Sequence, residues 1–597
     1  MNYIDKAVYR GKHCLIVFLL IFFVSACGSN GDATKTDKSD FDVPVDVPSD
    51  EPTILGSGTS DDLFDPNTII DVSIDMSASD FAALRAEGRT LASVAGECIP
   101  EFEFTDFVAK VTIDGVVIPN VEIRKKGFLG SISRIRPSLK LDFDTFVDDR
   151  TYNGMSRMTL NNDRQDPSHT HQCMAYDIFR QAGLAAPRCN LARVTVNGEA
   201  LGFYTNVENI KKPFLKANFG NNGGNLYEAQ IADFGIYTND KFEKKTNKSE
   251  NDRTDLNAVA NALALDDENL IDTLGALVDI DEFIRFWAVE TLIGHWDSAT
   301  GNANNYYLYH NPDDGLFHYL PWGTDAAFTG VNIFKPNSGP LYRSINLASR
   351  LYGIEQYKQQ YHDTLNELLD TLWNEQNLLA EVNRIQQLTS TPESAVTDMK
   401  SFISGSGIEG QEGYVRSQRA RLISAIAGLE PEQEDYLLND ELLDCDTPDL
   451  MTALSASVQS RAGNDTGSFA FTNKMGQSVT ASLFYASFEV DALQYSVSDL
   501  TSPPVVNLLL IGADANDDFK AYVLSVLIEA PDYTVGDHSL HGFATNLILL
   551  EADENAPGGA RTIALGSTGI ISLNSIGGSG AEGDVSMSIN ADLSFSQ

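Results

Sequence analysis

The chain has few basic residues for its length, and this deficit excludes one large class of ligands. Its 597 residues include 42 Lys and Arg against 84 Asp and Glu, a formal net charge of −42. Such an acidic chain repels phosphate backbones, so we expect no binding to nucleic acid. No heptad array, G-X-Y period or internal repeat is visible either, which excludes a fibrous protein. The length predicts three or four folding units of ordinary globular composition.

Long apolar runs are also missing, apart from one short run at the N-terminus. Leu15 to Val24 is apolar and follows a basic stretch, and it is too short for a transmembrane helix. This arrangement is typical of an export signal. The run ends in Val24-Ser25-Ala26-Cys27-Gly28, which resembles a bacterial lipobox. We therefore expect lipidation of Cys27, the alternative being an ordinary signal peptide with an incidental cysteine.

The residue after Cys27 bears on where such a lipoprotein is located. In Gram-negative lipoproteins an Asp at this position commonly signals retention in the inner membrane, and this chain has Gly28 instead. By this resemblance we expect an exported bacterial lipoprotein of the outer membrane or cell surface. Its contact with the membrane would be the N-terminal lipid.

Cysteine is scarce, and two of the six cysteines, Cys14 and Cys27, belong to the export signal and its lipobox. In an oxidising compartment the other four are disulfide candidates, with three possible pairings left open by the sequence. A metal site is the alternative, because two histidines lie close to one of these cysteines, but the spacing matches no structural zinc pattern. The candidates are Cys98, Cys173, Cys189 and Cys445, and the two histidines are His169 and His171.

Composition divides the chain into five segments. A signal over 1–26 precedes a disordered tether over 27–66 that is rich in Asp, Ser, Thr and Pro. A mixed α/β segment covers 67–432, a linker covers 433–465, and short β-rich runs separated by Gly, Asn, Asp and Ser fill 466–597. The last segment is typical of an all-β sandwich, so the fold class is α+β.

Within 67–432 the local patterns predict strands first and helices later. Asp114-Gly115 and Asn197-Gly198, each between β-rich runs, predict two hairpins. Beyond Thr254 the spacing of apolar residues is helical. The helices expected there and just before are Thr170–Ala182, Asp281–His295 and Ile354–Gln387, with a strand pair at Tyr306–Tyr309 and Leu316–Leu320.

Three motifs carry the strongest functional signal in the same segment. They read VNGEALGFY at 196–204, NNYYLY at 304–309 and PWGTDAAF at 321–328. In this order and spacing they resemble the spore-coat protein H (CotH) kinase family, from about Ile69 to Leu429. The resemblance implies an atypical protein-kinase-like domain with a strand-rich N-lobe and a helical C-lobe. It also implies an activity, because some members transfer phosphate from ATP to protein.

The resemblance assigns roles to three polar residues. Phosphoryl transfer needs a group that orients the acceptor hydroxyl and oxygen ligands for a divalent cation. The resemblance implies that Asp297 is the catalytic aspartate and that Asp325 and Asn305 hold Mg²⁺ or Mn²⁺ bound with ATP. Asn302 is the alternative to Asn305, because it follows Asp297 by five residues as in ordinary kinases. Without the family, each would be interpreted as a turn or capping residue.

The expected nucleotide-binding residues come from the strand-rich half. Lys140, predicted mid-strand after a glycine-containing loop, is the first choice for the ATP phosphates and for catalysis, with Lys125 and Lys126 as competitors. Gly127 and Gly130 would let the backbone approach phosphates. Glu208 either contacts the nucleotide or is purely structural. Asp233-Phe234-Gly235 spells a kinase metal motif but precedes Asp297, the wrong order, so we interpret it as a coincidence.

The leading hypothesis is an exported, lipid-anchored CotH-like atypical kinase that transfers the γ-phosphate of ATP to Ser or Thr of an unidentified surface protein. One alternative is a non-catalytic surface structural or adhesion protein that keeps the kinase fold as a scaffold. Another is a nucleotide- or metal-binding module without turnover. Active family members usually have Trp-Asp-x-Asp, and the first of these aspartates is Gly323 here, which favours the alternatives.

The lipid anchor gives the first testable prediction. Cys27→Ser should move the protein from the membrane fraction to the soluble fraction, because each acyl CH₂ buried in the bilayer contributes about 0.8 kcal/mol. Cys14→Ser, within the signal, is the control and should leave the partition unchanged. An unchanged membrane partition of Cys27→Ser would contradict lipidation.

Overall fold

The computed structural model describes most of the chain beyond the tether. The described ranges are 54–88, 103–127, 133–235, 239–250, 252–329, 339–405, 417–429, 450–461, 464–490, 505–515, 520–529, 533–540, 545–552, 560–576 and 585–595, with the short strands β1 (Cys27–Gly28) and β4 (Cys98–Ile99). The signal over 1–26, most of the tether, Gly130 and Cys445 lie outside the described residues.

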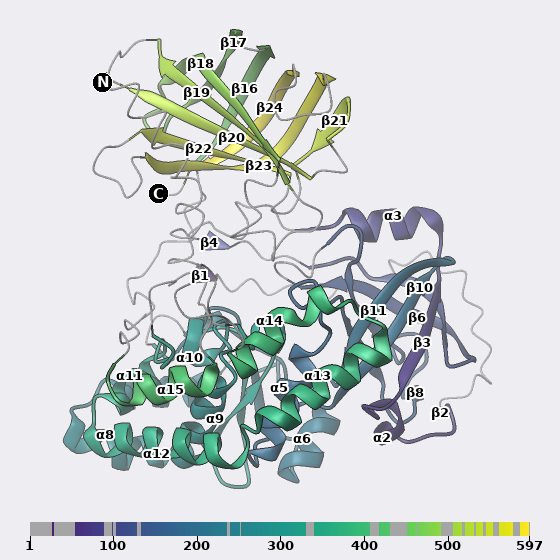
Figure 1. The fold of residues 1–597 in the computed structure, drawn as a ribbon, viewed down its shortest axis with the longest axis vertical. Helices are drawn as coiled ribbons and strands as arrows, with labels where there is room; N and C mark the ends of the chain where they lie inside the picture. The colour runs from purple at the N-terminus through teal and green to yellow at the C-terminus, as the bar shows by residue number, and fades with distance from the viewer. Residues whose placement is uncertain are drawn as a thin grey trace.

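Seven strands between Ile69 and Val207 form a closed barrel (Figure 1). Both predicted hairpins are confirmed, and at each turn an Asp or Asn with positive φ precedes the glycine. Alternate aliphatic side chains point inward and fill the barrel. The strands, in barrel order, are β10 (Cys189–Val196), β11 (Glu199–Val207), β9 (Arg157–Asn161), β7 (Ser138–Asp142), β6 (Val116–Lys126), β5 (Phe107–Ile113) and β3 (Ile69–Asp75).

Short elements accompany the barrel. The strands β2 (Ile54–Leu55) and β8 (Thr151–Tyr152) pair in parallel. Two helices, α2 (Ser60–Leu63) and α3 (Ala78–Ala86), flank the first long strand along the chain. Both helices begin with a side-chain cap, from Thr59 and Ser77 respectively, which satisfies amides of the first turn.

A four-stranded antiparallel sheet follows the barrel, and helices surround it. The strands, in sheet order, are β13 (Phe242–Lys244), β12 (Asn225–Ala229), β14 (Tyr306–His310) and β15 (Phe317–Pro321). The helices are α5 (His171–Gln181), α6 (Lys212–Phe219), α7 (Thr254–Leu263), α8 (Asp267–Gly275), α9 (Ile280–Leu292), α10 (Ala299–Asn302), α11 (Asn346–Tyr352), α12 (Glu355–Thr371), α13 (Glu375–Thr389), α14 (Glu393–Ser404) and α15 (Gln418–Ile426).

The helix α9 is the centre of this part. Its buried face packs against α12, where the rings of Trp287 and Tyr361 stack with centroids 3.7 Å apart. The single helix predicted over 354–387 is wrong, because the chain breaks between α12 and α13. Trp373 is buried at the break, and the Asn374 side chain caps α13 by accepting from the amide of Asn377. The local capping signal outweighs the continuous apolar pattern.

The strands from Leu450 onward form one nine-stranded sheet rather than the two sheets of a sandwich (Figure 1). The long strand β23 pairs with β22 through its first half and with β24 through its second, so the pairing closes on itself. Register shifts along β23 allow this change of partner. The strands are β16 (Leu450–Arg461), β17 (Asn464–Thr472), β18 (Ser478–Val490), β19 (Val505–Asp514), β20 (Ala521–Glu529), β21 (Gly536–Ser539), β22 (Asn546–Ala552), β23 (Ala560–Ile576) and β24 (Val585–Phe595).

This sheet has its own hydrophobic cluster, whose members all come from Leu454 to Phe595. The strand β16 lies inside the segment predicted as a linker, because its alternating small and apolar residues gave only a weak strand signal. Among the helices of the described ranges, none is long and apolar enough to span a membrane.

One disulfide joins two of the four candidate cysteines. Cys173 in α5 is bonded to Cys189 at the start of β10, 16 residues along the chain. The metal site considered as an alternative is therefore excluded, because a disulfide sulfur is not a thiolate ligand. Cys98 lies in β4 and Cys445 lies outside the described residues, so the expectation that these two cysteines also form disulfides stays a prediction.

Removing this crosslink gives the second prediction. For a loop of about this length, loss of the disulfide is expected to lower the free energy of unfolding by about 3 kcal/mol. Cys173→Ser, Cys189→Ser and the double variant should all lose the same amount in urea unfolding, because any one of them removes the bond. Losses that add up in the double variant would contradict the pairing.

Candidate functional site

Two loops that are distant in sequence meet beside the four-stranded sheet. One loop precedes β14 and the other follows β15, and these strands pair directly, with Tyr306 opposite Pro321. The ladder continues one step further, because the amide of Trp322 donates to the carbonyl of Asn305 at 3.1 Å. Residues on either side of this contact are therefore neighbours, and they include Asn305 and the turn around Asp325.

Asp297 is held by three amide side chains. Its carboxylate accepts hydrogen bonds from the Nδ2 atoms of Asn302 at 2.9 Å, Asn304 at 3.1 Å and Asn305 at 2.8 Å. Burial raises the pKa of Asp297 to about 6, although these three donors favour the charged form. Both residues considered as the second metal ligand, Asn302 and Asn305, thus contact the predicted catalytic aspartate.

The short helix α10 sets the positions of these amides. Its first-turn amides at Ala299 and Thr300 donate to the carboxylate of Glu290, at 3.2 and 2.8 Å. Glu290 is completely buried in α9, and burial raises its pKa to about 7. The loop that carries Asp297 is therefore fixed to the central helix by buried hydrogen bonds.

Gly323 makes room for the side chain of Asn305. Both residues have left-handed backbone conformations, with φ of 51° and 52°. A Cβ placed at position 323 would lie 2.6 Å from Oδ1 of Asn305, closer than real Cβ atoms approach. An Asp at 323, as active family members have, would therefore displace Asn305. The glycine allows the Asn305 amide to point its Nδ2 at Asp297 and its Oδ1 toward the Asp325 turn.

Asp325 lies in a single 3₁₀ turn over Thr324–Ala326. Burial raises its pKa to about 7, and the negative charge of Asp297 acts in the same direction, whereas Lys126 lowers it. The turn is anchored from α5, where Nδ1 of His171 donates to the carbonyl of Asp325 at 2.9 Å. Asp166 accepts in turn from the backbone amide of His171 at 2.7 Å. The local position of Asp325 therefore depends on the start of α5.

Of the three candidate lysines, Lys126 lies closest to this centre. Its Nζ donates to Asn161 and lies 5.9 Å from the centre of the Trp322 ring. Burial lowers the pKa of Lys126, and the charge of Asp325 opposes that shift. Lys125 points the other way and donates to the carbonyls of Arg85 and Glu87. Alternation along β6 therefore separates the two adjacent lysines.

Lys140, the lysine preferred from the sequence, lies on β7, the strand that pairs with β6. It is opposite Arg124, whereas Lys126 is opposite Ser138. Burial lowers the pKa of Lys140 to about 7, Arg124 adds to this, and Glu228 opposes it. Electrostatically, Lys126 therefore interacts with Asp325, and Lys140 interacts with Glu228.

The remaining predicted residues do not gather at this centre. Glu208 is buried, and its carboxylate accepts from Arg188 at 2.6 and 3.0 Å. Gly127 directly follows β6, with φ of 112°. Asp233 caps α11 by accepting from the amide of Asn346 at 2.7 Å, which supports interpreting the Asp-Phe-Gly sequence as a coincidence.

Several polar residues of the site were not identified from the sequence. Burial would raise the pKa of Glu228, but Lys245, Lys140 and the Tyr307 hydroxyl lower it to about 2. The Lys245 ammonium lies 2.5 Å from this carboxylate. No local pattern marks Glu228, because its neighbours are set by the pairing of β12 with β14. Asp163, which accepts from Thr205 and pairs with His169 at 2.8 Å, was likewise assigned no role from the sequence.

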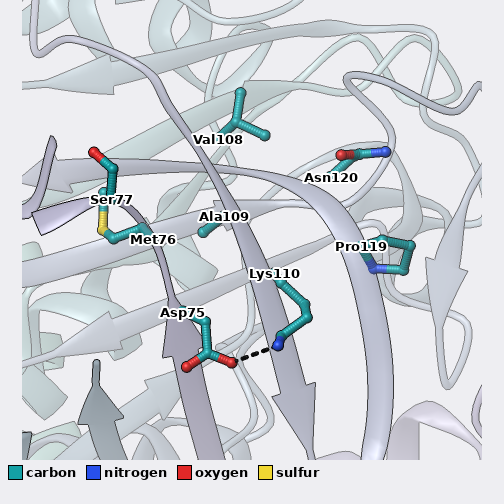
Figure 2. Close-up of a pocket in the computed structure, with 8 residues that line it drawn as sticks. All are labelled: Asp75, Met76, Ser77, Val108, Ala109, Lys110, Pro119 and Asn120. Atoms are coloured by element: carbon teal, nitrogen blue, oxygen red, sulfur yellow. Dashed lines mark ion pairs between the residues drawn. The ribbon is translucent and has the colours of Figure 1, made fainter. Parts of the chain in front are cut away.

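A shallow depression on the barrel contains none of the predicted residues. Asp75, Lys110 and the other labelled residues in Figure 2 line it, and the Asp75–Lys110 ion pair spans 2.9 Å. Both side chains are about half exposed, so the pair is a surface interaction of low energy. Among the residues that the structure describes, no group of three or more His, Cys, Asp or Glu side chains has the geometry of a metal site.

Comparison with known proteins agrees with the motifs. A family model described as CotH kinase protein matches residues 123–414, and this part of the chain belongs to the CotH family. Inner spore coat protein H of Bacillus subtilis (strain 168) is 23% identical over 290 residues, which cover 45% of this chain and 79% of that protein.

Relatives are also found in the fungus Rhizopus delemar (strain RA 99-880). Invasin CotH2 is 25% identical over 281 residues, 40% of this chain and 45% of that protein. Spore coat protein homolog 1 is 29% identical over 182 residues, 28% of this chain and 29% of that protein. The chain thus spans less than half the length of these two fungal relatives.

The close approach of Gly323 to Asn305 gives the third prediction. Gly323→Ala should lower the melting temperature more than Gly220→Ala does. Both glycines have positive φ, which costs an Ala roughly 1–2 kcal/mol, but a Cβ at Gly220 meets nothing within 4 Å. In an Asn305→Ala background the extra loss should disappear, and an unchanged extra loss would contradict the contact.

Proposed function

We propose that the centre around Asp297, Asn305, Asp325 and Lys126 is the active site of an exported, lipid-anchored, CotH-like atypical protein kinase. It transfers the γ-phosphoryl group of ATP to Ser or Thr of a surface protein. The observation that supports this is the convergence of the four side chains from the barrel and from two separate loops. In this proposal the barrel acts as the N-lobe and the helical part as the C-lobe.

The donor set fits a divalent cation bound together with the nucleotide. Asp325 offers a carboxylate with a raised pKa, and Oδ1 of Asn305 faces the same turn. Oxygen ligands of this kind suit Mg²⁺ or Mn²⁺, with the remaining ligands from phosphate and water. When bound, the cation neutralises charge on the transferred phosphoryl group. Lys126 contributes a second positive charge on the barrel side.

Asp297 is suited to orient and deprotonate the acceptor. The acceptor hydroxyl oxygen forms a bond to the γ-phosphorus, the bond to the ADP oxygen breaks, and Asp297 takes the hydroxyl proton. A general base works best with a pKa near the operating pH, and burial brings Asp297 to about 6. The three Asn amides hold its carboxylate in one orientation.

A non-catalytic surface protein is the second candidate, and two observations favour it. Gly323 replaces an aspartate of the family motif, and an Asp would not fit beside Asn305. Curated relatives in R. delemar are named invasins, which suits adhesion with the kinase fold as scaffold. A nucleotide-binding module without turnover is the intermediate case.

The fourth prediction separates the roles of the two aspartates. Asp325→Asn should weaken Mg-ATP binding, because an amide is a poorer ligand for a hard dication than a carboxylate. It should reduce phosphate transfer by at least ~10²-fold, roughly 2.7 kcal/mol of barrier. Asp297→Asn should keep nucleotide binding and lose transfer. The measurements are thermal shift against Mg-ATP and phosphate incorporation by intact mass.

Asp75→Asn is the matched control, because Asp75 pairs with Lys110 on the barrel surface. It should behave like the wild type in both measurements. Equal thermal shifts for wild type and Asp325→Asn would show that Asp325 is not a ligand. No shift in the wild type would favour the scaffold over the kinase.

A further inference from the structure

A row of cations continues along the barrel beyond Lys126. Residues two apart on a strand lie on one face, roughly 7 Å apart. The register of β6 with β7 therefore places the Arg124–Lys140 pair next to the Lys126–Ser138 pair on that face. Lys140 is in turn opposite Thr159 on β9. The row of cations thus runs from the Asp325 centre along β6 and β7 and ends beside Thr159 of β9.

Lys211 extends this row from the helical part. The hydroxyl of Thr159 donates to Asn209 at 2.8 Å, which brings the chain just before α6 against the same face of the barrel. Lys211 follows two residues later, at the N-cap of α6, where no side chain caps the helix. The partial positive charge of the helix end adds to that of the ammonium group.

The charges of Lys140 and Lys211 are only partly compensated, by the carboxylate of Glu228. Among the described residues, no carboxylate oxygen lies within 4 Å of the ammonium nitrogen of Lys140 or Lys211. The neighbouring cations Arg157 and Lys245 do have such a carboxylate partner. Glu228 binds Lys245, and Asp142 binds Arg157. Burial lowers the pKa of Lys140 to about 7, with Arg124 adding to the effect, and burial lowers that of Lys211 to about 8, with Lys245 and Arg157 adding. The cost of bringing these charges together points to an anionic ligand.

We infer that Lys126, Lys140 and Lys211 bind the phosphate chain of the donor, so that a linear chain of three phosphates is recognised without a nucleobase. Each ammonium is a compact charge with three donors, which suits phosphate oxygens. The charged groups that act on Lys140 and Lys211 include the Glu228–Lys245 ion pair, whereas a planar base is usually held by apolar surface. This inference rests on the proposed function and widens its donor class to any triphosphate.

The test is a set of titrations of the mature protein in excess Mg²⁺, with thermal shift as the readout. The ligands are ATP, GTP, inorganic tripolyphosphate and orthophosphate. We expect the three triphosphates to bind within about threefold of one another, less than 1 kcal/mol, and orthophosphate to bind far more weakly. If ATP binds and tripolyphosphate does not, the inference fails and the proposed function stands. If no triphosphate binds, both fail.

Variants locate the site. Lys140→Met and Lys211→Met should each weaken all three triphosphates by about tenfold or more, equivalent to 1.4 kcal/mol. Lys110→Met is the matched control, because Lys110 is an exposed lysine on the same barrel, and it should bind like the wild type. Equal weakening by Lys110→Met, or none by Lys140→Met and Lys211→Met, would overturn the assignment.

The pH dependence provides an independent measurement. Lysines lose their charge as the pH rises through their pKa, so affinity for tripolyphosphate should fall between pH 6.5 and pH 9. The Lys140→Met/Lys211→Met double variant should show a much flatter dependence over this range. An equally steep fall in the double variant would overturn the inference, because the titrating groups would then lie elsewhere.

Discussion

The pairing of β14 with β15 is the constraint on which the site depends. These strands place Tyr306 opposite Pro321, and each carries a functional loop at the paired end. The relative position of the two loops therefore follows first from this register, and a hydrogen bond from the amide of Phe328 to the carbonyl of Ile293 at 2.7 Å supports it. A slip of one residue would turn every side chain of a strand to the opposite face. The buried aromatic residues of both strands oppose such a slip.

Much of the local structure was predictable because its determinants are short in sequence. Asp-Gly and Asn-Gly turns identified both barrel hairpins, and the helix expected over Thr170–Ala182 is present as α5 (His171–Gln181). The meeting of Asp297, Asn305 and Asp325 was predictable only through the family motifs. Nothing in their spacing brings together residues that are nearly 30 positions apart.

Sequence alone does not determine which of the candidate lysines faces the site. Alternation establishes that Lys125 and Lys126 face opposite sides of β6, but not which of them faces the site. That depends on closure of the barrel, which buries Lys125 completely. The partners of Glu228 and the closed pairing of β23 depend likewise on contacts between distant strands. Such contacts leave no local pattern, because any alternating strand satisfies them equally well.

The disulfide has a consequence for when the site is assembled. Cys173 is two residues from His171, which holds the Asp325 turn through its carbonyl. A newly made chain in a reducing cytoplasm has free thiols, and α5 is then held to β10 by packing alone. Under the proposed export route the covalent tie forms only after secretion. On that route the start of α5 would be crosslinked to β10 only outside the cell, so synthesis and maturation of the site would take place in different compartments.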